Sequence, residues 1–141
     1  MSCEVNKIRM PQAVKERWIN ALRSGKYKQG QGSLLDEAGG YCCLGVLVKE
    51  LEGELHKLKD GDDVRYERMP SMEFLAKHGI EPSRHVTFLD FDDVKYADPI
   101  CFEIVTDDMD ATLPKLNDDW HYNFVEISNI IEDQVEGYTN E

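Results

Sequence analysis

Long hydrophobic runs are missing from this chain. Although 41% of its 141 residues are hydrophobic, no run approaches the length needed to cross a bilayer. The first residues, MSCEVNKIRMPQ, lack the apolar core of a secretory signal peptide. We therefore expect a cytoplasmic protein without a membrane partner. A chain of this length can bury a core without disulfides or a metal, so we expect one domain over residues 1–141, with 1–10 as a flexible N-terminal segment.

The sequence also lacks the ligand spacings of metal sites. Zinc sites need ligand pairs two to four residues apart, whereas Cys42 and Cys43 are directly adjacent and the four histidines stand singly. The acidic clusters at 60–63, 90–93 and 107–110 lack the sixth-position glycine and the final glutamate of a calcium-binding EF-hand loop. We expect no metal and no cofactor, and we interpret these clusters as solvated loops.

Cations are scarce, with 16 lysines and arginines against 28 acidic residues and a net charge of −12. Because phosphate binding needs a cationic surface, nucleic acid is not an expected partner. The cations are concentrated, however, since residues 1–35 hold seven of them against two glutamates. This asymmetry indicates either a basic site carried by an acidic body or simply a basic first helix.

Hydrophobic periodicity predicts helices over 11–24, 42–55, 70–78 and 123–135. In the second, Gly45 lies on the apolar face, where it would let another backbone come close. In the last, Asn123 and Glu126 have the spacing of a capping box.

Between these helices, the pattern predicts a surface hairpin within 53–68 and two strands, over 85–91 and 99–106, joined by the polar segment 92–98. The fold class is therefore α+β: a single compact domain with about four helices and a small, mostly antiparallel sheet.

Cys43 is a candidate nucleophile. Without an export signal the four cysteines are expected to be free thiols, and Cys43 opens a predicted helix whose dipole would favour the thiolate. His85 begins a predicted strand about forty residues later. This order, cysteine on a helix and then histidine on a strand, resembles the papain-like peptidases that cut bacterial cell walls. The alternative is that Cys42 and Cys43 are small apolar packing residues and His85 an edge residue.

The segment RSGKYKQGQGS, which follows the first helix, is a candidate anion site. Its cations lie among Gly25, Gly30 and Gly32, which would let the backbone fold around a phosphate and expose amide groups, while Tyr27 could stack on a base. It is not a Walker sequence, so ATP hydrolysis is not implied. The alternative is a helix C-cap followed by a solvated loop. The candidate ligand-binding residues are Trp18, Arg23, Lys26, Tyr27, Lys28 and Gln29.

Four segments together resemble a family. They are Trp18 with ALRSGKYKQ (21–29), YCCLGVL (41–47), LPKLND (113–118) and FVEISNIIE (124–132). This combination is similar to small uncharacterised accessory proteins encoded by tailed bacteriophages and prophages. The resemblance covers both ends of the chain but not 53–112, and Ser128 stands where the family usually has alanine.

The resemblance implies a context rather than an activity: a small protein made in an infected bacterium, where many such genes block host systems. We expect a non-catalytic accessory protein in the host cytoplasm that neutralises a host defence component, best explained as a sponge for a nucleotide-type signalling molecule. One alternative is an acidic inhibitor of a host enzyme, with a host protein as partner. The other is a cysteine hydrolase using Cys43 and His85, which is disfavoured because His85 lies outside the shared pattern. A homo-oligomer stays open.

Overall fold

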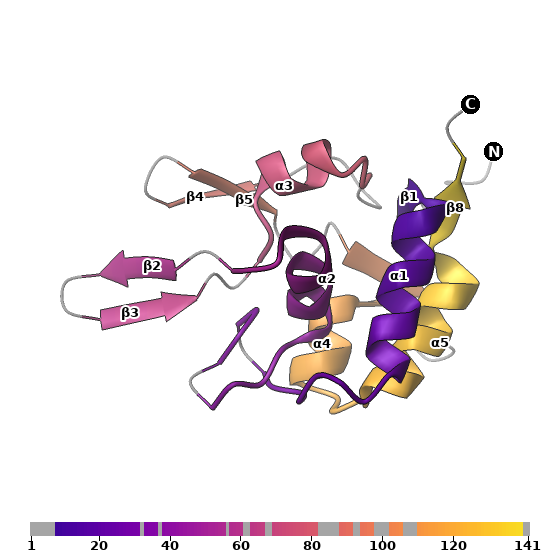
Figure 1. The fold of residues 1–141 in the computed structure, drawn as a ribbon, viewed down its shortest axis with the longest axis horizontal. Coiled ribbons are helices and arrows are strands. Elements are labelled where there is room, and N and C mark those ends of the chain that lie inside the picture. Colours follow the sequence, from indigo (N-terminus) through magenta and orange to yellow (C-terminus); the bar gives the residue numbers. More distant parts are fainter. Residues whose placement is uncertain are drawn as a thin grey trace.

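The structure, a computed structural model, describes residues 8–31, 33–36, 38–55, 57–60, 63–66, 69–81, 88–91, 94–97, 102–105 and 110–139. Five helices and eight strands lie within these residues. Helices and short strand pairs are interspersed along one compact domain (Figure 1), so the predicted α+β class is confirmed. None of the helices in the described part of the chain is both long and apolar enough to cross a membrane.

Three helices form the centre of the molecule: α1 (Gln12–Arg23), α2 (Cys43–Glu52) and α5 (Phe124–Gln134). Helices α1 and α5 run side by side, and α2 packs against α1 (Figure 1). All three start and stop within three residues of the predicted bounds. The capping box of α5 is confirmed, because Asn123 Oδ1 accepts from the Glu126 amide at 2.8 Å and Glu126 Oε1 accepts from the Asn123 amide at 3.0 Å.

Two shorter helices complete the set. Helix α3 (Met72–Lys77) lies within the predicted range, and its N-cap Ser71 accepts a hydrogen bond from the Phe74 amide at 3.1 Å. Helix α4 (Leu113–Asp118) was not predicted, because six residues are too few to show helical periodicity. Thr112 caps it by accepting from the Lys115 amide at 3.3 Å.

The strands form four two-stranded sheets, three of them antiparallel within the described residues. The predicted hairpin is confirmed as β2 (Lys57–Asp60) paired antiparallel with β3 (Asp63–Tyr66). The next region was predicted correctly only in part: strands lie within 85–91 and 99–106, but 92–98 is not simply a connection. The segment taken as a polar connection contains β5 (Val94–Ala97), which pairs with β4 (Phe88–Phe91), while β6 (Glu103–Val105) pairs with β7 (Asp110–Thr112).

The fourth pair is parallel and joins the two ends of the described chain. Strand β1 (Arg9–Pro11) lies beside β8 (Glu136–Tyr138), and on its other side the Arg9 backbone exchanges hydrogen bonds of 2.9 and 2.7 Å with Glu81. Ile8 and Met10 are buried. The expectation of flexibility therefore fails for residues 8–10, because alternate residues of this short strand enter the core.

Helix α2 is the most deeply buried element, since every residue from Cys43 to Val48 is buried. The close approach expected at Gly45 is confirmed: a Cβ on Gly45 would overlap the Leu34 carbonyl oxygen and lie 2.7 Å from its carbon. The loop between α1 and α2 therefore packs directly on the α2 backbone. The largest fully buried side chains among the described residues include Trp18, Phe102, Leu34, Leu44, Leu47, Leu113, Leu116 and Ile127.

Candidate functional site

The loop between α1 and α2, which contains the predicted anion site, folds back on itself. The Gly30 amide donates to the Tyr41 carbonyl at 2.8 Å, and the Tyr41 amide donates to the Lys28 carbonyl at 2.7 Å. Gly30 and Gly40 meet where the two limbs touch, because a Cβ on Gly30 would lie 2.7 Å from the Gly40 carbonyl carbon. The glycines thus allow a contact between two parts of the loop, rather than between the loop and a ligand.

Asp36 supplies this loop with an anion of its own. Its Oδ1 accepts hydrogen bonds from the Ala38 amide at 2.9 Å and the Gly40 amide at 2.8 Å. Its other oxygen lies against the point where Gly30 and Gly40 meet. The amides of this limb of the loop are therefore bonded to a carboxylate of the chain itself.

Trp18, the first of the predicted ligand residues, belongs to the core. Its side chain is fully buried, and the indole Nε1 donates to the Cys43 carbonyl at 2.8 Å. This bond satisfies a polar atom that burial would otherwise leave without water. Trp18 therefore joins α1 to the first turn of α2 and does not reach the surface.

Arg23 joins α1 to α5. Its Nε donates to Ser128 Oγ at 2.9 Å, and an Nη donates to Asn129 Oδ1 at 2.8 Å and to Glu132 Oε2 at 2.5 Å. Three bonds from one guanidinium fix both its position and its orientation. The side chain is 37% exposed, so its outer edge still meets solvent.

Lys26 and Tyr27 converge with Arg17 on Glu50 of α2. The Nζ of Lys26 lies 3.5 Å and the Nε of Arg17 3.3 Å from the carboxylate, and the Tyr27 hydroxyl donates to it. The hydrogen bond from Tyr27 lowers the pKa of Glu50 most, burial opposes this, and Arg17 and Lys26 lower it further. Burial, together with the bond to Glu50, raises the pKa of Tyr27. These groups form an ion-pair cluster, not an open anion site.

The last two predicted ligand residues differ in how firmly they are held. Gln29 Nε2 donates to Asn117 Oδ1 at 2.8 Å and to the Tyr122 carbonyl at 2.7 Å, which ties the loop to α4. Lys28 is exposed and makes one long contact of 3.4 Å with the Ala38 carbonyl. Lys26 is also largely exposed, at 67%, but unlike Lys28 it lies beside a carboxylate of the chain.

Asn117 of α4 is a structural centre that the sequence analysis missed. The residue is fully buried, and its Nδ2 donates to the Gly30 carbonyl and to Asp118 Oδ1, both at 2.8 Å. With the bond from Gln29, both ends of the Asn117 amide are paired. The sequence analysis did quote the segment LPKLND, which contains Asn117, but nothing in the composition of this segment indicated which part of the chain it would contact.

The surroundings of Cys43 are those of a packing residue and not of a nucleophile. The Cys43 side chain is fully buried, its Sγ donates to the Leu113 carbonyl at 3.7 Å, and burial raises the pKa of the thiol well above its ordinary value. The neighbouring Cys42 Sγ accepts from the Gly45 amide at 3.3 Å, and burial raises its pKa to about 12. Desolvation thus outweighs the helix dipole on which the hypothesis rested. His85 lies outside the described residues.

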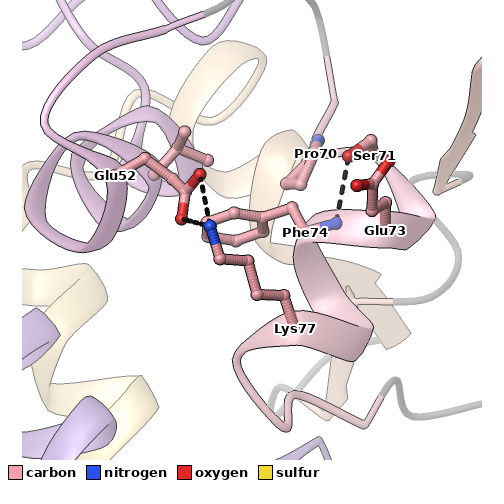
Figure 2. A pocket seen from close by; sticks show the side chains of 7 residues that line it. Glu52, Pro70, Ser71, Glu73, Phe74 and Lys77 are labelled. Carbon is pink, nitrogen blue, oxygen red and sulfur yellow. Dashed lines mark hydrogen bonds and ion pairs between the residues drawn. The ribbon is translucent and has the colours of Figure 1, made fainter.

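One pocket of about 130 Å³ lies between α2 and α3. The side chains of Val48, Pro70 and Phe74 form its apolar part, and Glu52, Ser71, Glu73 and Lys77 supply the polar groups. Figure 2 shows the Lys77 ammonium directed at the Glu52 carboxylate, with the Phe74 ring beside them. No unusual motif marks these residues, so the sequence analysis did not single them out.

Glu52 is the charged centre of this pocket. His78 Nε2 lies 2.5 Å and Lys77 Nζ 3.2 Å from its Oε2, and the His78 ring packs at 4.8 Å from the Phe74 ring. The hydrogen bond with His78 lowers the pKa of Glu52 most, burial opposes this, and Lys77 lowers it further. Glu52 therefore carries its negative charge at neutral pH.

Within the described part of the chain, no three His, Cys, Asp or Glu side chains are grouped so that they could hold a metal ion. The fold is an α+β domain whose basic loop is tied to three helices. Residues 10–135 match a family described as a domain of unknown function (DUF8296), and the chain belongs to that family. No curated protein and no solved structure matches the chain.

Proposed function

We propose that this protein is a non-catalytic accessory protein of a bacteriophage or prophage, which binds and neutralises a basic protein component of host defence. The observation that carries the proposal is the internal pairing of the basic loop. Arg23, Lys26, Tyr27 and Gln29 are bonded to acidic or amide groups of α2, α4 and α5. A loop closed in this way has little to offer a phosphate, so the net charge of −12 becomes the dominant feature for recognition.

Ion pairs support this proposal, because cations concentrated near the start of the chain are neutralised within the fold. Arg9 pairs with Glu81, Arg17 and Lys26 pair with Glu50, and Arg23 pairs with Glu132, at distances from 2.5 to 3.5 Å. Carboxylates that enter no such pair are exposed on several elements, among them Glu54, Asp119 and Asp133. A negative surface of this kind speeds association with a positive partner and repels acidic ones.

The pocket between α2 and α3 is too small to be a nucleotide site. Pockets for small ligands commonly have volumes of about 300–1,000 Å³, and the pocket between α2 and α3 has about 130 Å³. Sequestration of a nucleotide-type signal is the alternative proposal, and it would need the loop to open and Asp36 to leave its amides. The proposed location for either version is the host cytoplasm.

Capture from infected host lysate tests the proposal. Tagged wild-type protein is the bait, and its matched control is a triple variant, Glu54→Gln with Asp119→Asn and Asp133→Asn, which removes three exposed charges. We expect a basic host protein that is retained at about 0.05 M salt and released at about 0.5 M, because salt screens exposed charges. We also expect slower association with the triple variant. A neutral or acidic partner, or retention independent of salt, would contradict the proposal.

A further inference from the structure

The pocket between α2 and α3 has room for one side chain. An apolar cavity of about 150 Å³ in another protein accepts benzene, so about 130 Å³ suits a single planar group with part of its stem. Protein interfaces often depend on such an anchor, in which one large side chain fills a pocket on the partner. The volume therefore indicates an anchor site.

The lining has two kinds of surface. Val48 of α2 and Pro70 and Phe74 beside it are apolar and nearly buried, which suits the methylene stem of a long side chain. Glu52 and Glu73 place carboxylates at the same pocket, from α2 and α3 respectively (Figure 2). Apolar walls with carboxylates match the two halves of a long cationic side chain.

Lys77 already places a cation there. Its Nζ lies 3.2 Å from one oxygen of Glu52 and 3.4 Å from the other. Figure 2 marks both contacts with dashed lines. The Lys77 side chain is 62% exposed, and exposed pairs of this kind hold only weakly. A cation that binds Glu52 more tightly than the Lys77 ammonium does can therefore displace it, while the bond between Glu52 and His78 is kept.

We propose that this pocket receives an arginine side chain of the basic partner, an inference that rests on the proposed function. The guanidinium replaces the Lys77 ammonium beside Glu52, its second edge faces Glu73, and its stem lies against Val48 and Pro70. Arginine fits better than lysine because the guanidinium is planar, is more weakly hydrated and stacks on aromatic rings such as Phe74. The charged and titratable groups facing the site are Glu52, Glu73, Lys77 and His78.

Substitutions of Lys77 and of Glu52 should change the affinity for arginine in opposite directions. Lys77→Gln removes the competing cation and should tighten arginine binding several-fold, whereas Glu52→Gln should weaken it about tenfold, as expected for a partly desolvated charge pair. Because Glu52→Gln also disturbs the bond to His78, Glu73→Gln is the second variant, since Glu73 is exposed. The matched control is Glu16→Gln, an exposed glutamate of α1 outside the pocket lining.

The probe is N-acetyl-argininamide, titrated into ¹⁵N-labelled protein and followed by NMR, with N-acetyl-lysinamide and N-acetyl-leucinamide as comparisons. We expect saturable shifts in residues 48–52 and 70–78, largest for the arginine probe and larger in Lys77→Gln than in wild type. Shifts elsewhere, equal shifts with the leucine probe, or no gain in Lys77→Gln would overturn the proposal.

The capture experiment separates this inference from the proposed function. If wild type and Glu73→Gln retain the same basic protein with equal affinity, and Glu52→Gln does too, the pocket is not the anchor and the proposed function stands. If no basic protein is captured, the proposed function itself fails, whatever the small-molecule titration shows.

Discussion

Replacing Gly45 by alanine separates two opposing effects on α2. Helix propensity alone predicts that Gly45→Ala stabilises the protein by about 1 kcal/mol. The packing predicts the reverse, because the added Cβ would lie 2.7 Å from the Leu34 carbonyl carbon and 3.1 Å from its Cα. Leu34 is fully buried, and its carbonyl accepts a hydrogen bond from the Cys42 amide at 3.3 Å. To restore ordinary contact, the Leu34 backbone must retreat and weaken that bond.

The two sides of this balance can be estimated. Overpacking of this kind costs about 1–3 kcal/mol, and the weakened hydrogen bond adds about 1 kcal/mol. After the gain in helix propensity, we expect a net loss of about 2 kcal/mol in the free energy of unfolding, or about 6 °C in melting temperature for a domain of this size.

Urea denaturation with a thermal melt measures this loss. The matched control is Gly53→Ala at the end of the same helix, where a Cβ meets nothing within 4 Å but the backbone φ of 81° is left-handed. The control should lose only about 1 kcal/mol, from backbone strain. If Gly45→Ala is as stable as wild type, or loses less than Gly53→Ala, the close contact between Leu34 and α2 is wrong.

Three further predictions follow from buried and paired groups. Iodoacetamide should leave Cys43 unlabelled in the native protein at neutral pH and label it in urea, as peptide mass spectrometry would show; rapid native labelling would mean an accessible thiol. Asn117→Leu should lower the free energy of unfolding by about 2–4 kcal/mol, because it leaves the Gly30 carbonyl without its side-chain donor and removes one of the two bonds of Gln29 Nε2; an unchanged urea midpoint would refute that role. The folded pKa of Glu50 lies below its ordinary value of 4.5, so its stabilisation is complete above that value and lost as pH falls through the folded pKa. Glu50→Gln should therefore lower the melting temperature at neutral pH and weaken its fall as the pH is lowered below 4.5. The exposed control Glu54→Gln should change neither the melting temperature nor its dependence on pH.

Much of the helical framework could be predicted because its signals are local. Helix α1 follows a proline and precedes a glycine, α2 and α5 each repeat apolar residues at helical spacing, and the capping box of α5 is visible in the sequence. The β1–β8 pair and α4 could not be predicted, because each element has only three to six residues. Strand β5 was missed because its residues looked like a polar connection.

The basic loop shows why a candidate site is harder to predict than a helix. The sequence displays Arg23 but not its partners, which lie more than a hundred residues later on α5. One partner is Ser128, whose buried hydroxyl accepts from Arg23 and donates to the Val125 carbonyl at 2.7 Å. A cluster of cations predicts a phosphate site only if the fold leaves those cations unpaired, and that depends on distant residues.

The pocket between α2 and α3 is the opposite case, a candidate site that the sequence did not indicate. Val48 and Glu52 lie in the second half of α2, while Pro70, Phe74 and Lys77 belong to a segment about twenty residues later. None of these residue types is unusual where it stands, so periodicity assigns them to helices and nothing more. Only the packing of the two helices brings two carboxylates and an apolar surface together.

The central claim, that the loop between α1 and α2 is a closed structural element and not a nucleotide site, is tested most directly by isothermal titration calorimetry. Wild-type protein is titrated with a panel of cyclic and ADP-ribose-type nucleotides. The internal bonds of Arg23, Tyr27 and Gln29, with Asp36 held on the loop amides, predict no heat of binding for any of them. Stoichiometric binding of one nucleotide that Arg23→Ala with Lys26→Ala abolishes, while the melting temperature is preserved, would contradict the account.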